Sequence, residues 1–379
     1  MSPFQATSVL VTGGAGFIGS NFIRWALQQH PALRIINFDL LTYAGNLESL
    51  TDVEDAFGVR GERRYQFVHG DISDFKLVSR LLGGLPDTAG AARDWATVNA
   101  VVHFAAESHV DRSILGPEPF FATNVTGTLM LLEAVRAELG QRPRPFRFIH
   151  VSTDEVFGDL GPHDPAFTET TPLRPNSPYA ASKAASDLLV RAHVHTFGIP
   201  AILTRCSNNY GPYQFPEKLI PLMITRALAD QPLPVYGNGQ NVRDWVHVVD
   251  HAEAVWTVLE RGAVGETYNI GGECEVPNLE IVKRVLRALG KPESLIQFVA
   301  DRPGHDRRYA MNISKIRRDL GWRPRQGLDD GLRETVNWYV EHRRWWERVL
   351  SEAYRAANAM YLGPRRARAA RPRTHKRRV

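Results

Sequence analysis

The sequence predicts an α/β protein: a doubly wound, Rossmann-type parallel sheet with a smaller C-terminal substrate-binding lobe. Two observations lead to this fold class. Short apolar stretches alternate with amphipathic stretches as far as residue 205, which is typical of strands and helices in a parallel sheet. A glycine-rich turn, TGGAGFIG at residues 12–19, follows the first apolar stretch. Such a turn between a strand and a helix is typical of nucleotide-binding α/β folds.

Periodicity places the individual elements. Strands are expected at residues 9–11, 34–38, 65–68, 100–104, 146–152 and 201–205, and helices at 20–29, 75–82, 124–139 and 177–197. The first helix has an apolar face formed by Phe22, Ile23, Ala26 and Leu27. Residues 83–97 contain Gly, Pro and Asp and are expected to form a surface connection.

The alternation breaks after residue 205, which suggests a domain boundary. Five prolines, at 212, 216, 221, 232 and 234, interrupt the following segment. We therefore expect residues 1–205 to form the dinucleotide-binding domain. Residues 206–345 would be mainly a substrate-binding lobe with some return to the first domain, and 346–379 a helix end followed by a basic, disordered tail.

The charge distribution argues against a nucleic-acid-binding body. The formal net charge is +5, but residues 364–379 carry eight Arg or Lys and no Asp or Glu. Without these eight, 38 basic side chains remain against 41 acidic ones. The basicity thus belongs to a tail that we expect to be solvated, with weak polyanion contact as the alternative.

Composition also bounds the setting of the protein. No apolar run reaches the roughly 18 residues that span a bilayer, and the N-terminus does not have the pattern of a signal peptide. Two cysteines, Cys206 and Cys274, provide neither a disulfide framework nor a metal cluster. We expect a cytoplasmic protein with no membrane contact and no metal.

The glycine turn predicts a cofactor. Gly13, Gly16 and Gly19 allow a tight turn and a close approach of backbone N–H groups to a pyrophosphate at a helix N-terminus. Asp39 ends the second strand, where a carboxylate binds a ribose 2′-hydroxyl and repels a 2′-phosphate. The pattern therefore favours NAD over NADP, with a ligand-free turn as the alternative.

Two further strand ends fit a dinucleotide less specifically. Asp71 and Ile72 follow the third strand, where such folds hold the adenine, although Asp71 could equally be a helix N-cap. Phe104, Ala105 and Ala106 end the fourth strand. Their small side chains would admit a dinucleotide or close helix packing.

Tyr179 and Lys183 lie one turn apart on one face of a predicted helix. A tyrosine has a pKa near 10, so it is a poor base at neutral pH. A lysine cation and a positively charged nicotinamide would stabilise the phenolate and lower that pKa. The spacing alone is common in surface pairs. Its place after the fifth strand of a dinucleotide fold favours catalysis.

Thr153, Asp154 and Glu155 follow that strand, at the edge where doubly wound folds bind ligands. Adjacent acids usually form a solvated turn. In this position they fit elimination of water beside a ketone, which needs a base for the α-proton and an acid for the departing hydroxyl. Thr153 can offer its hydroxyl to the oxygen that is oxidised.

These segments together resemble one family, the extended short-chain dehydrogenase/reductases that act on nucleotide sugars, and among them the dTDP-glucose 4,6-dehydratases. The resemblance covers nearly all of residues 8–340. Its motifs are at 12–19, 39–47, 103–113, 152–158, 177–183, 208–214, 241–245 and 301–305. The Thr-Asp-Glu triplet separates these dehydratases from related epimerases.

The resemblance implies NAD as the cofactor and a dTDP-glucose substrate that is oxidised at C4, dehydrated across C5 and C6, and reduced at C6. It makes Tyr179 the base for oxidation, Asp154 the acid and Glu155 the base for elimination. The implied cofactor-binding residues are Gly13, Gly16, Phe17, Ile18, Gly19, Asp39, Leu40, Leu41, Thr42, Asp71, Ile72, Phe104, Ala105, Ala106, Ser108, Thr123, Tyr179, Lys183 and Asn209.

The implied substrate-binding residues are Ser108, His109, Thr153, Asn208, Lys218, Leu219, Pro234, Val235, Tyr236, Arg243, Asn278, Asp301, Arg302, Pro303, Gly304 and His305. The resemblance also implies a homodimer, formed by the helices around 124–139 and 177–197. Three other functions stay open: a dehydratase for UDP- or CDP-glucose, a 4-epimerase, and a non-catalytic NAD-binding scaffold.

Overall fold

Seven parallel strands form the central sheet of the computed structural model, in the order β10-β6-β5-β4-β1-β2-β3. The structure describes residues 3–84 and 97–351. The strands are β1 (Ser8–Thr12), β2 (Arg34–Asp39), β3 (Tyr65–His69), β4 (Ala100–His103), β5 (Arg147–Thr153), β6 (Ala201–Cys206) and β10 (Thr267–Ile270). The order reverses between β1 and β4, as in doubly wound dinucleotide-binding folds. The predicted fold class is confirmed.

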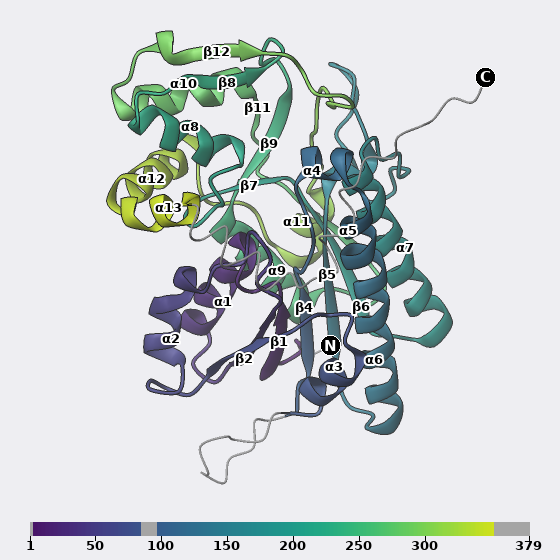
Figure 1. Cartoon of the computed structure of the whole chain (residues 1–379). Helices are drawn as coiled ribbons and strands as arrows, with labels where there is room; N and C mark the ends of the chain where they lie inside the picture. The colour runs from purple at the N-terminus through teal and green to yellow at the C-terminus, as the bar shows by residue number, and fades with distance from the viewer. Residues whose placement is uncertain (1–2, 85–96, 352–379) are drawn as a thin grey trace, which may run out of the picture.

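Helices cover both faces of this sheet (Figure 1). On one face, α1 (Phe17–Gln29), α9 (Val248–Arg261) and α11 (Ser314–Leu320) enclose a core that includes Phe22, Ile23 and Trp256. On the other face, α3 (Phe75–Leu82), α6 (Thr128–Gln141) and α7 (Pro178–Phe197) pack on Leu10 and Phe148. The short elements η1 (Leu47–Leu50) and α2 (Thr51–Phe57) lie beside α1. A sheet covered on both faces exposes its strand ends, not its surfaces, to a ligand.

Helix α1 begins at Phe17, so the expected start near residue 20 was wrong. Gly19 lies inside the first turn of the helix and not in the loop before it. A Cβ at Gly19 would lie 2.3 Å from the Gly13 carbonyl oxygen, a distance that no side chain tolerates. The third glycine therefore allows helix and loop to pack closely, as the fingerprint requires.

The helix expected at 124–139 is longer and irregular. It comprises α5 (Glu118–Phe121), a π-helical turn (Ala122–Gly127) and α6, after the short α4 (Val110–Leu115). In the π turn, the Asn124 side chain accepts from the Glu107 backbone N–H at 2.9 Å and donates to its carbonyl at 3.0 Å. Such turns often occur at functional sites, and this one fixes the loop after β4. Most of the expected connection at 83–97 lies outside the described residues.

A second lobe covers the carboxyl edge of the sheet (Figure 1). It contains two small sheets, β7-β9-β11 and β8-β12, with helices packed around Tyr210, Ile224 and Leu286. Its elements are β7 (Asn208–Tyr210), α8 (Leu219–Leu228), β8 (Leu233–Tyr236), β9 (Val242–His247), β11 (Glu275–Pro277), α10 (Asn278–Leu289), η4 (Glu293–Leu295), β12 (Ile296–Val299), α12 (Leu328–Glu341) and α13 (Arg343–Leu350). Strand β10 and helices α9 and α11 follow the start of this lobe in the sequence, but they belong to the seven-stranded sheet and the helices that cover it.

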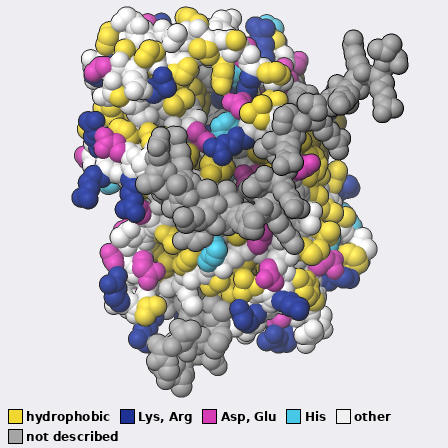
Figure 2. Space-filling model, viewed as in Figure 1, with side chains coloured by type: hydrophobic (Ala, Val, Ile, Leu, Met, Phe, Trp, Pro, Cys, Tyr) yellow, Lys and Arg dark blue, Asp and Glu magenta, His cyan; other side chains and the backbone are white. Residues whose placement is uncertain are grey.

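Acidic and basic side chains are interspersed over the described part of the face in Figure 2. Within residues 3–84 and 97–351, no helix is both long and apolar enough to cross a membrane. The basic tail proposed from the sequence, at 364–379, lies outside the described residues.

A charged group is buried behind the sheet edge. Asp187 of α7 accepts a hydrogen bond from Arg205 Nε of β6 at 2.9 Å and lies 3.4 Å from His150 Nε2 of β5. Burial alone would raise the pKa of Asp187, but His150 and Arg205 lower it overall. Burial holds the pKa of His150 at about 4, so this imidazole is neutral near pH 7. The contact therefore joins α7 to two central strands.

Asp187→Asn should lower the free energy of unfolding by about 3 kcal/mol, because it leaves the guanidinium of Arg205 buried without its counter-charge. Urea denaturation measures the change. The matched control is Asp329→Asn, which removes the exposed partner of Arg284. That control should cost less than about 1 kcal/mol. Equal effects of the two substitutions would contradict the prediction.

Candidate active site

One continuous pocket runs along the carboxyl ends of β1, β2, β4 and β5, beneath the second lobe. It extends from the glycine turn after β1 to Tyr179 and Lys183 on α7. Its predicted residues are Gly13, Gly16, Phe17, Ile18, Gly19, Asp39, Leu40, Thr42, Asp71, Ile72, Phe104, Ala105, Ala106, Ser108, Thr123, Thr153, Glu155, Tyr179, Lys183, Asn208, Asn209 and Lys218. The fold thus brings together residues as far apart in the sequence as Gly13 and Lys218.

The glycine turn has the geometry of a dinucleotide cradle. Gly13 has a φ of +71°, and a Cβ there would lie 2.5 Å from the backbone nitrogen of Ala105. Backbone therefore approaches backbone where a pyrophosphate has to reach the N–H groups of α1. The residues that line the pocket at the glycine turn therefore fit a dinucleotide.

Asp39 has a second task besides the predicted ribose contact. Its buried carboxylate accepts from the backbone N–H groups of Ala15 at 2.9 Å and Leu41 at 2.7 Å. These bonds join the glycine turn to the loop after β2, and Leu41 there has a positive φ of 53°. Burial raises the pKa of Asp39, and the two backbone bonds oppose this change.

The helix-cap alternative for Asp71 is wrong. Asp74 caps α3 by accepting from Leu77 N–H, whereas Asp71 accepts from Ser73 N–H within the turn before the helix. Asp71 and Ile72 both line the pocket. Their position is compatible with an adenine contact.

The acid pair lies in a single turn at the end of β5. Thr153 ends the strand, and a 3-10 turn, η3 (Asp154–Phe157), follows. Thr153 Oγ1 donates to Asp154 Oδ1 at 3.1 Å and accepts from Glu155 N–H at 3.3 Å. Asp154 is 2% exposed, and its Oδ2 has no hydrogen-bond partner in the described part of the chain. A buried carboxyl oxygen of this kind calls for a polar ligand or a proton.

The environments of the two acids differ. Burial and then the Glu155 charge raise the pKa of Asp154 well above its usual value. Burial also raises the pKa of Glu155, but the cations of Arg302, Lys218 and Arg243 oppose this increase. Only Glu155 has three cations that oppose the increase in its pKa. Neighbouring carboxyl groups in such different environments can divide the roles of acid and base.

Tyr179 and Lys183 face this turn from α7. Lys183 Nζ donates to the Val151 carbonyl at 2.9 Å, which joins the helix to β5. Burial and then the Glu155 charge raise the pKa of Tyr179 well above its usual value, while a hydrogen bond with Thr153 lowers it. The protein groups alone therefore do not produce the lowered pKa that the sequence suggested. That argument also needs the positive nicotinamide.

Comparison with known proteins gives the family. A family model described as GDP-mannose 4,6 dehydratase matches residues 10–335. A dTDP-glucose 4,6-dehydratase of Xanthomonas campestris pv. campestris (strain B100) is 54% identical over 360 residues, covering 91% of this chain and 97% of the relative. One of Neisseria meningitidis serogroup B is 52% identical, covering 92% and 97%. The chain belongs to the dTDP-glucose 4,6-dehydratase family.

Solved structures agree with this membership. DesIV, a dTDP-glucose 4,6-dehydratase of Streptomyces venezuelae whose crystal structure has NAD bound, matches with a TM-score of 0.81 and 48% identity, covering 90% of this chain and 99% of DesIV. A UDP-glucose 4-epimerase of Thermus thermophilus, in complex with NAD, matches with a TM-score of 0.74 and 30% identity, covering 88% and 99%. The family resemblance drawn from the motifs is confirmed.

Several residues that the dehydratase resemblance assigned lie outside this pocket's lining or have other partners. The residues outside the lining are Leu41, His109, Asp154, Leu219, Pro234, Val235, Tyr236, Arg243, Asn278, Asp301, Arg302, Pro303, Gly304 and His305. Asn209 lines the pocket, but its amide is held by His251 Nδ1 at 2.8 Å and the Ser207 carbonyl at 3.0 Å. Asn278 does not cap a helix, since the N-cap of α10 is Pro277.

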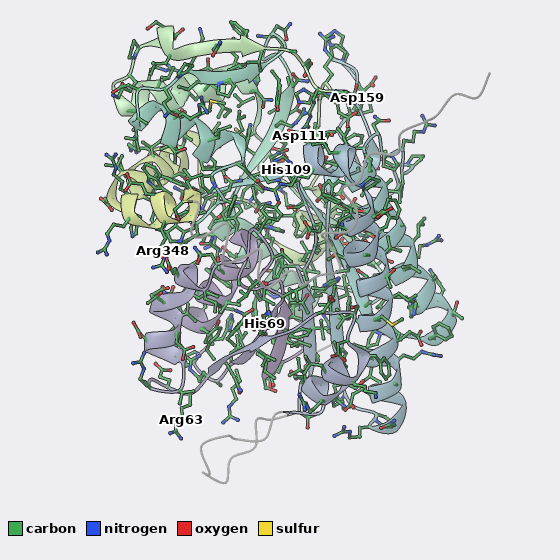
Figure 3. All side chains as sticks on the ribbon, in the orientation of Figure 1. Arg63, His69, His109, Asp111, Asp159 and Arg348 are labelled. Atoms are coloured by element: carbon green, nitrogen blue, oxygen red, sulfur yellow. The ribbon has the colours of Figure 1, made fainter. Side chains whose placement is uncertain are left out.

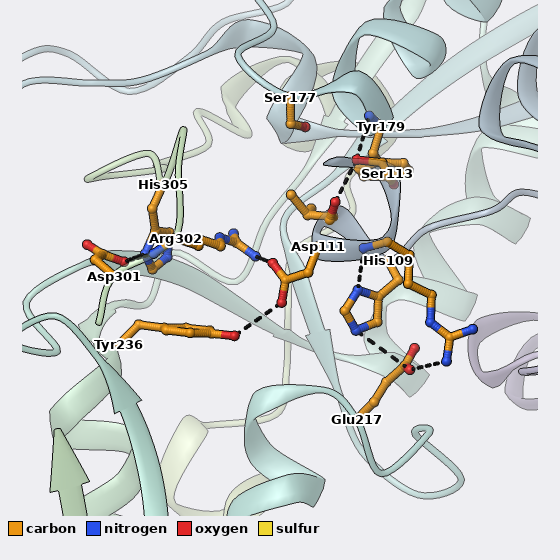
Figure 4. A network of polar contacts seen from close by, with 12 residues as sticks. His109, Asp111, Ser113, Ser177, Tyr179, Glu217, Tyr236, Asp301, Arg302 and His305 are labelled. Atoms are coloured by element: carbon orange, nitrogen blue, oxygen red, sulfur yellow. Dashed lines mark hydrogen bonds and ion pairs between the residues drawn. The ribbon is translucent and has the colours of Figure 1, made fainter. Parts of the chain in front are cut away.

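Two of these residues, Arg243 and Arg302, still influence the acid pair, because their charges lower the pKa of Glu155. Figure 4 shows Arg302 and His305 close to Tyr236 at the lobe side of the site. His305 Nδ1 lies 2.6 Å from Asp301 Oδ1, and Arg302 N–H donates to the same carboxylate. The loop at 301–305 is therefore braced internally.

The pocket also contains residues to which the sequence analysis assigned no role in the site. These are Phe38, Tyr43, Ala44, Gly45, Gly70, Glu107, Val151, Ser152, Cys206, Ser207, Gln214, Phe215 and Glu217. Most of them adjoin a predicted site residue, so adjacency to a motif was the available signal. No periodicity distinguishes Glu217, and only the fold brings it opposite α4.

Proposed function

We propose that this protein is an NAD-dependent dTDP-glucose 4,6-dehydratase that forms dTDP-4-keto-6-deoxyglucose and water. One observation carries the proposal. Buried Asp154 and half-buried Glu155 are adjacent in one turn in different electrostatic environments, and Glu155 lines the same pocket as Tyr179 and the dinucleotide cradle. Oxidation followed by elimination requires all three groups together.

The cofactor would lie along the sheet edge. Gly13, Gly16 and Gly19 would hold its pyrophosphate, Asp39 its adenosine ribose, and the end of β5 its nicotinamide. NAD supplies a reversible hydride acceptor and a positive charge beside the tyrosine. The other residues that we propose for the cofactor are Phe17, Ile18, Leu40, Leu41, Thr42, Asp71, Ile72, Phe104, Ala105, Ala106, Ser108, Thr123, Lys183 and Asn209.

The chain's own groups then carry the proton transfers. Tyr179 takes the proton of the 4-hydroxyl while C4 loses a hydride, and Lys183 holds the tyrosine helix on β5. The ketone makes the C5 proton acidic, so Glu155 removes it. Asp154 protonates the C6 hydroxyl, which leaves as water. The double bond then regains the hydride at C6 and a proton at C5, with no net oxidation.

The cationic side of the site fits a nucleoside diphosphate. Half-buried Lys218 and buried Arg243 act on Glu155 together with Arg302. A diphosphate would provide the counter-charge for these groups. We propose that this lobe holds the nucleotide, with Ser108, His109, Thr153, Asn208, Leu219, Pro234, Val235, Tyr236, Asn278, Asp301, Pro303, Gly304 and His305 as the other contacts.

A 4-epimerase needs a tyrosine and NAD but no acid–base pair for water loss. The environments of Asp154 and Glu155 thus favour a dehydratase. Cys206 and Cys274 are both free, which supports our proposal of a reducing, cytoplasmic setting.

We also propose a homodimer through α7 and the helices before it. Large apolar side chains are exposed on this side: Leu115 is 89% exposed, Leu188 54%, Phe197 47% and Phe121 43%. Exposed apolar side chains gathered on neighbouring helices are typical of an interface. Association of two copies would bury them in a bundle of four helices.

Incubation with dTDP-glucose tests the function directly. We expect a 4-keto-6-deoxy product, seen by its absorbance in alkali and by mass spectrometry as the loss of water. UDP-glucose and CDP-glucose, supplied in parallel, should react more slowly. Recovery of unchanged sugar, or of only its C4 epimer, would contradict the dehydratase proposal.

Glu155→Gln and Asp154→Asn should separate the two roles. Each should lower kcat by about 10²–10⁴-fold, as expected for loss of a general acid or base. In heavy water, NMR of the recovered substrate should show deuterium at C5 for Asp154→Asn but not for Glu155→Gln. The reverse pattern would exchange the acid and base assignments.

The acid limb of the pH profile should depend on Lys218. Glu155 acts as a base only when deprotonated, and the Lys218 cation opposes the increase in its pKa that burial causes. Lys218→Gln should raise this pKa, so at a given acidic pH less carboxylate is present. The acid limb of kcat at saturating substrate should therefore move to higher pH. An unmoved limb would show that another group controls it.

Leu188→Arg should convert the proposed dimer to a monomer, because it places a charge in an apolar interface. Light scattering after size exclusion measures the mass. The control is Val249→Arg, on α9 at the opposite face, where Val249 is 39% exposed. A monomeric wild-type protein, or an unchanged mass for Leu188→Arg, would contradict this interface.

A further inference from the structure

The short helix α4 bridges the sheet and the second lobe. Figure 3 shows His109 and Asp111 in this position, between the strand ends and the lobe above them. His109 Nε2 lies 3.6 Å from Glu217 Oε2, and Arg112 donates to the same oxygen at 3.3 Å. Residues 109 and 112 are one turn apart, so they share a face and a partner. Asp111 points elsewhere.

Asp111 contacts two residues that lie far away in the sequence (Figure 4). Its Oδ1 accepts from Arg302 Nη1 at 3.1 Å, and its Oδ2 accepts from the Tyr236 hydroxyl at 3.2 Å. One carboxylate thus holds the 301–305 loop and the end of β8 against α4. Neither the sequence motifs nor the reaction assigns a role to this carboxylate.

Arg302 and Tyr236 each retain a group that Asp111 does not engage. Arg302 Nε is buried and has no hydrogen-bond partner among residues 3–84 and 97–351. Tyr236 is 41% exposed, and its ring meets that of His305 edge-on at 6.0 Å. A guanidinium with an unused N–H and an exposed aromatic ring are the groups that recognise a phosphate and a base.

We propose that Asp111 is a positioning residue for the nucleotide diphosphate. Its carboxylate holds Arg302 and Tyr236 in the arrangement that binds the nucleotide. This inference rests on the proposed function and adds a residue to it. Asp111 itself does not contact the ligand. It acts by holding two long side chains in place before binding, which lowers the entropic cost of ordering them in the complex.

A competing effect has the opposite sign. The negative charge of Asp111 repels a diphosphate, so its removal could strengthen binding. Arg302 neutralises that charge at 3.1 Å, and both side chains are partly exposed, at 22% for Arg302 and 34% for Asp111. Solvent therefore screens the repulsion. The ordering effect should prevail.

Calorimetric titration with dTDP tests the inference without turnover. With the NAD-loaded protein, Asp111→Ala should raise the Kd for dTDP about tenfold, and Asp111→Asn should raise it less, because the amide oxygen still accepts a hydrogen bond. Tighter binding by Asp111→Asn than by wild type would overturn the inference, since repulsion would then dominate. The control Asp329→Ala, at an exposed ion pair with Arg284, should bind as wild type does.

Kinetics and a double-mutant cycle separate positioning from general damage. Asp111→Ala should raise KM for dTDP-glucose about tenfold, with kcat changed less than twofold and the NAD content and Tm unchanged. In an Arg302→Ala background, Asp111→Ala should have a clearly smaller effect on Kd, because one of its two targets is absent. Fully additive effects, or equal losses in kcat and KM, would overturn the inference.

The same experiments distinguish this inference from the proposed function. If wild type binds dTDP and forms the keto product but Asp111→Ala does so equally well, only the role of Asp111 is wrong. If wild type neither binds dTDP nor changes dTDP-glucose, the proposed function fails, and the inference fails with it.

Discussion

A hydrogen bond from the Lys183 ammonium to the Val151 carbonyl holds the tyrosine helix against the strand that carries the acid pair. It joins α7 to the last turn of β5, so that Tyr179, one helical turn earlier, faces the triplet that begins two residues after Val151. Burial of the ammonium lowers the pKa of Lys183, and the nearby Asp187 carboxylate opposes that change. Asp187 is itself held by Arg205 of the next strand. Helix α7 is thus fixed by buried charge as well as by apolar packing.

Charged residues of the second lobe affect the pKa values of the two acids in the triplet, which belong to the first domain. Asp154 and Glu155 are neighbours in one turn, and burial raises the pKa of both. Three cations from the second lobe, Lys218, Arg243 and Arg302, oppose the increase for Glu155. Of these three cations, only Arg243 is among the main influences on the pKa of Asp154. The neighbouring Glu155 raises that pKa further. The lobe that we propose to hold the nucleotide therefore also acts on the pKa of the proposed base.

Helix α4 and the loops after β7 and β12 form one of the places where the lobe meets the first domain. On one face of α4, His109 and Arg112 pair with Glu217, and on another Asp111 holds Arg302 and Tyr236. These contacts are polar and partly exposed, unlike the apolar cores on either side. An interface of this kind is weaker than a core, which suits a boundary that a substrate has to enter.

The sequence by itself determined the strands, most helices, the glycine turn and the residue types of the catalytic turn, because these depend on local periodicity and on motifs. It placed the start of α1 three residues late, since Gly19 looks like a loop residue until the approach of Gly13 is known. It took Asp71 as a possible cap, although Asp74 has that role. Only the tertiary structure decided that cations of the second lobe act on Glu155, that Asn209 is bonded to His251, and that Asp111 meets Arg302 and Tyr236. Burial and charge depend on residues that lie far apart in the chain, and no local pattern contains that information.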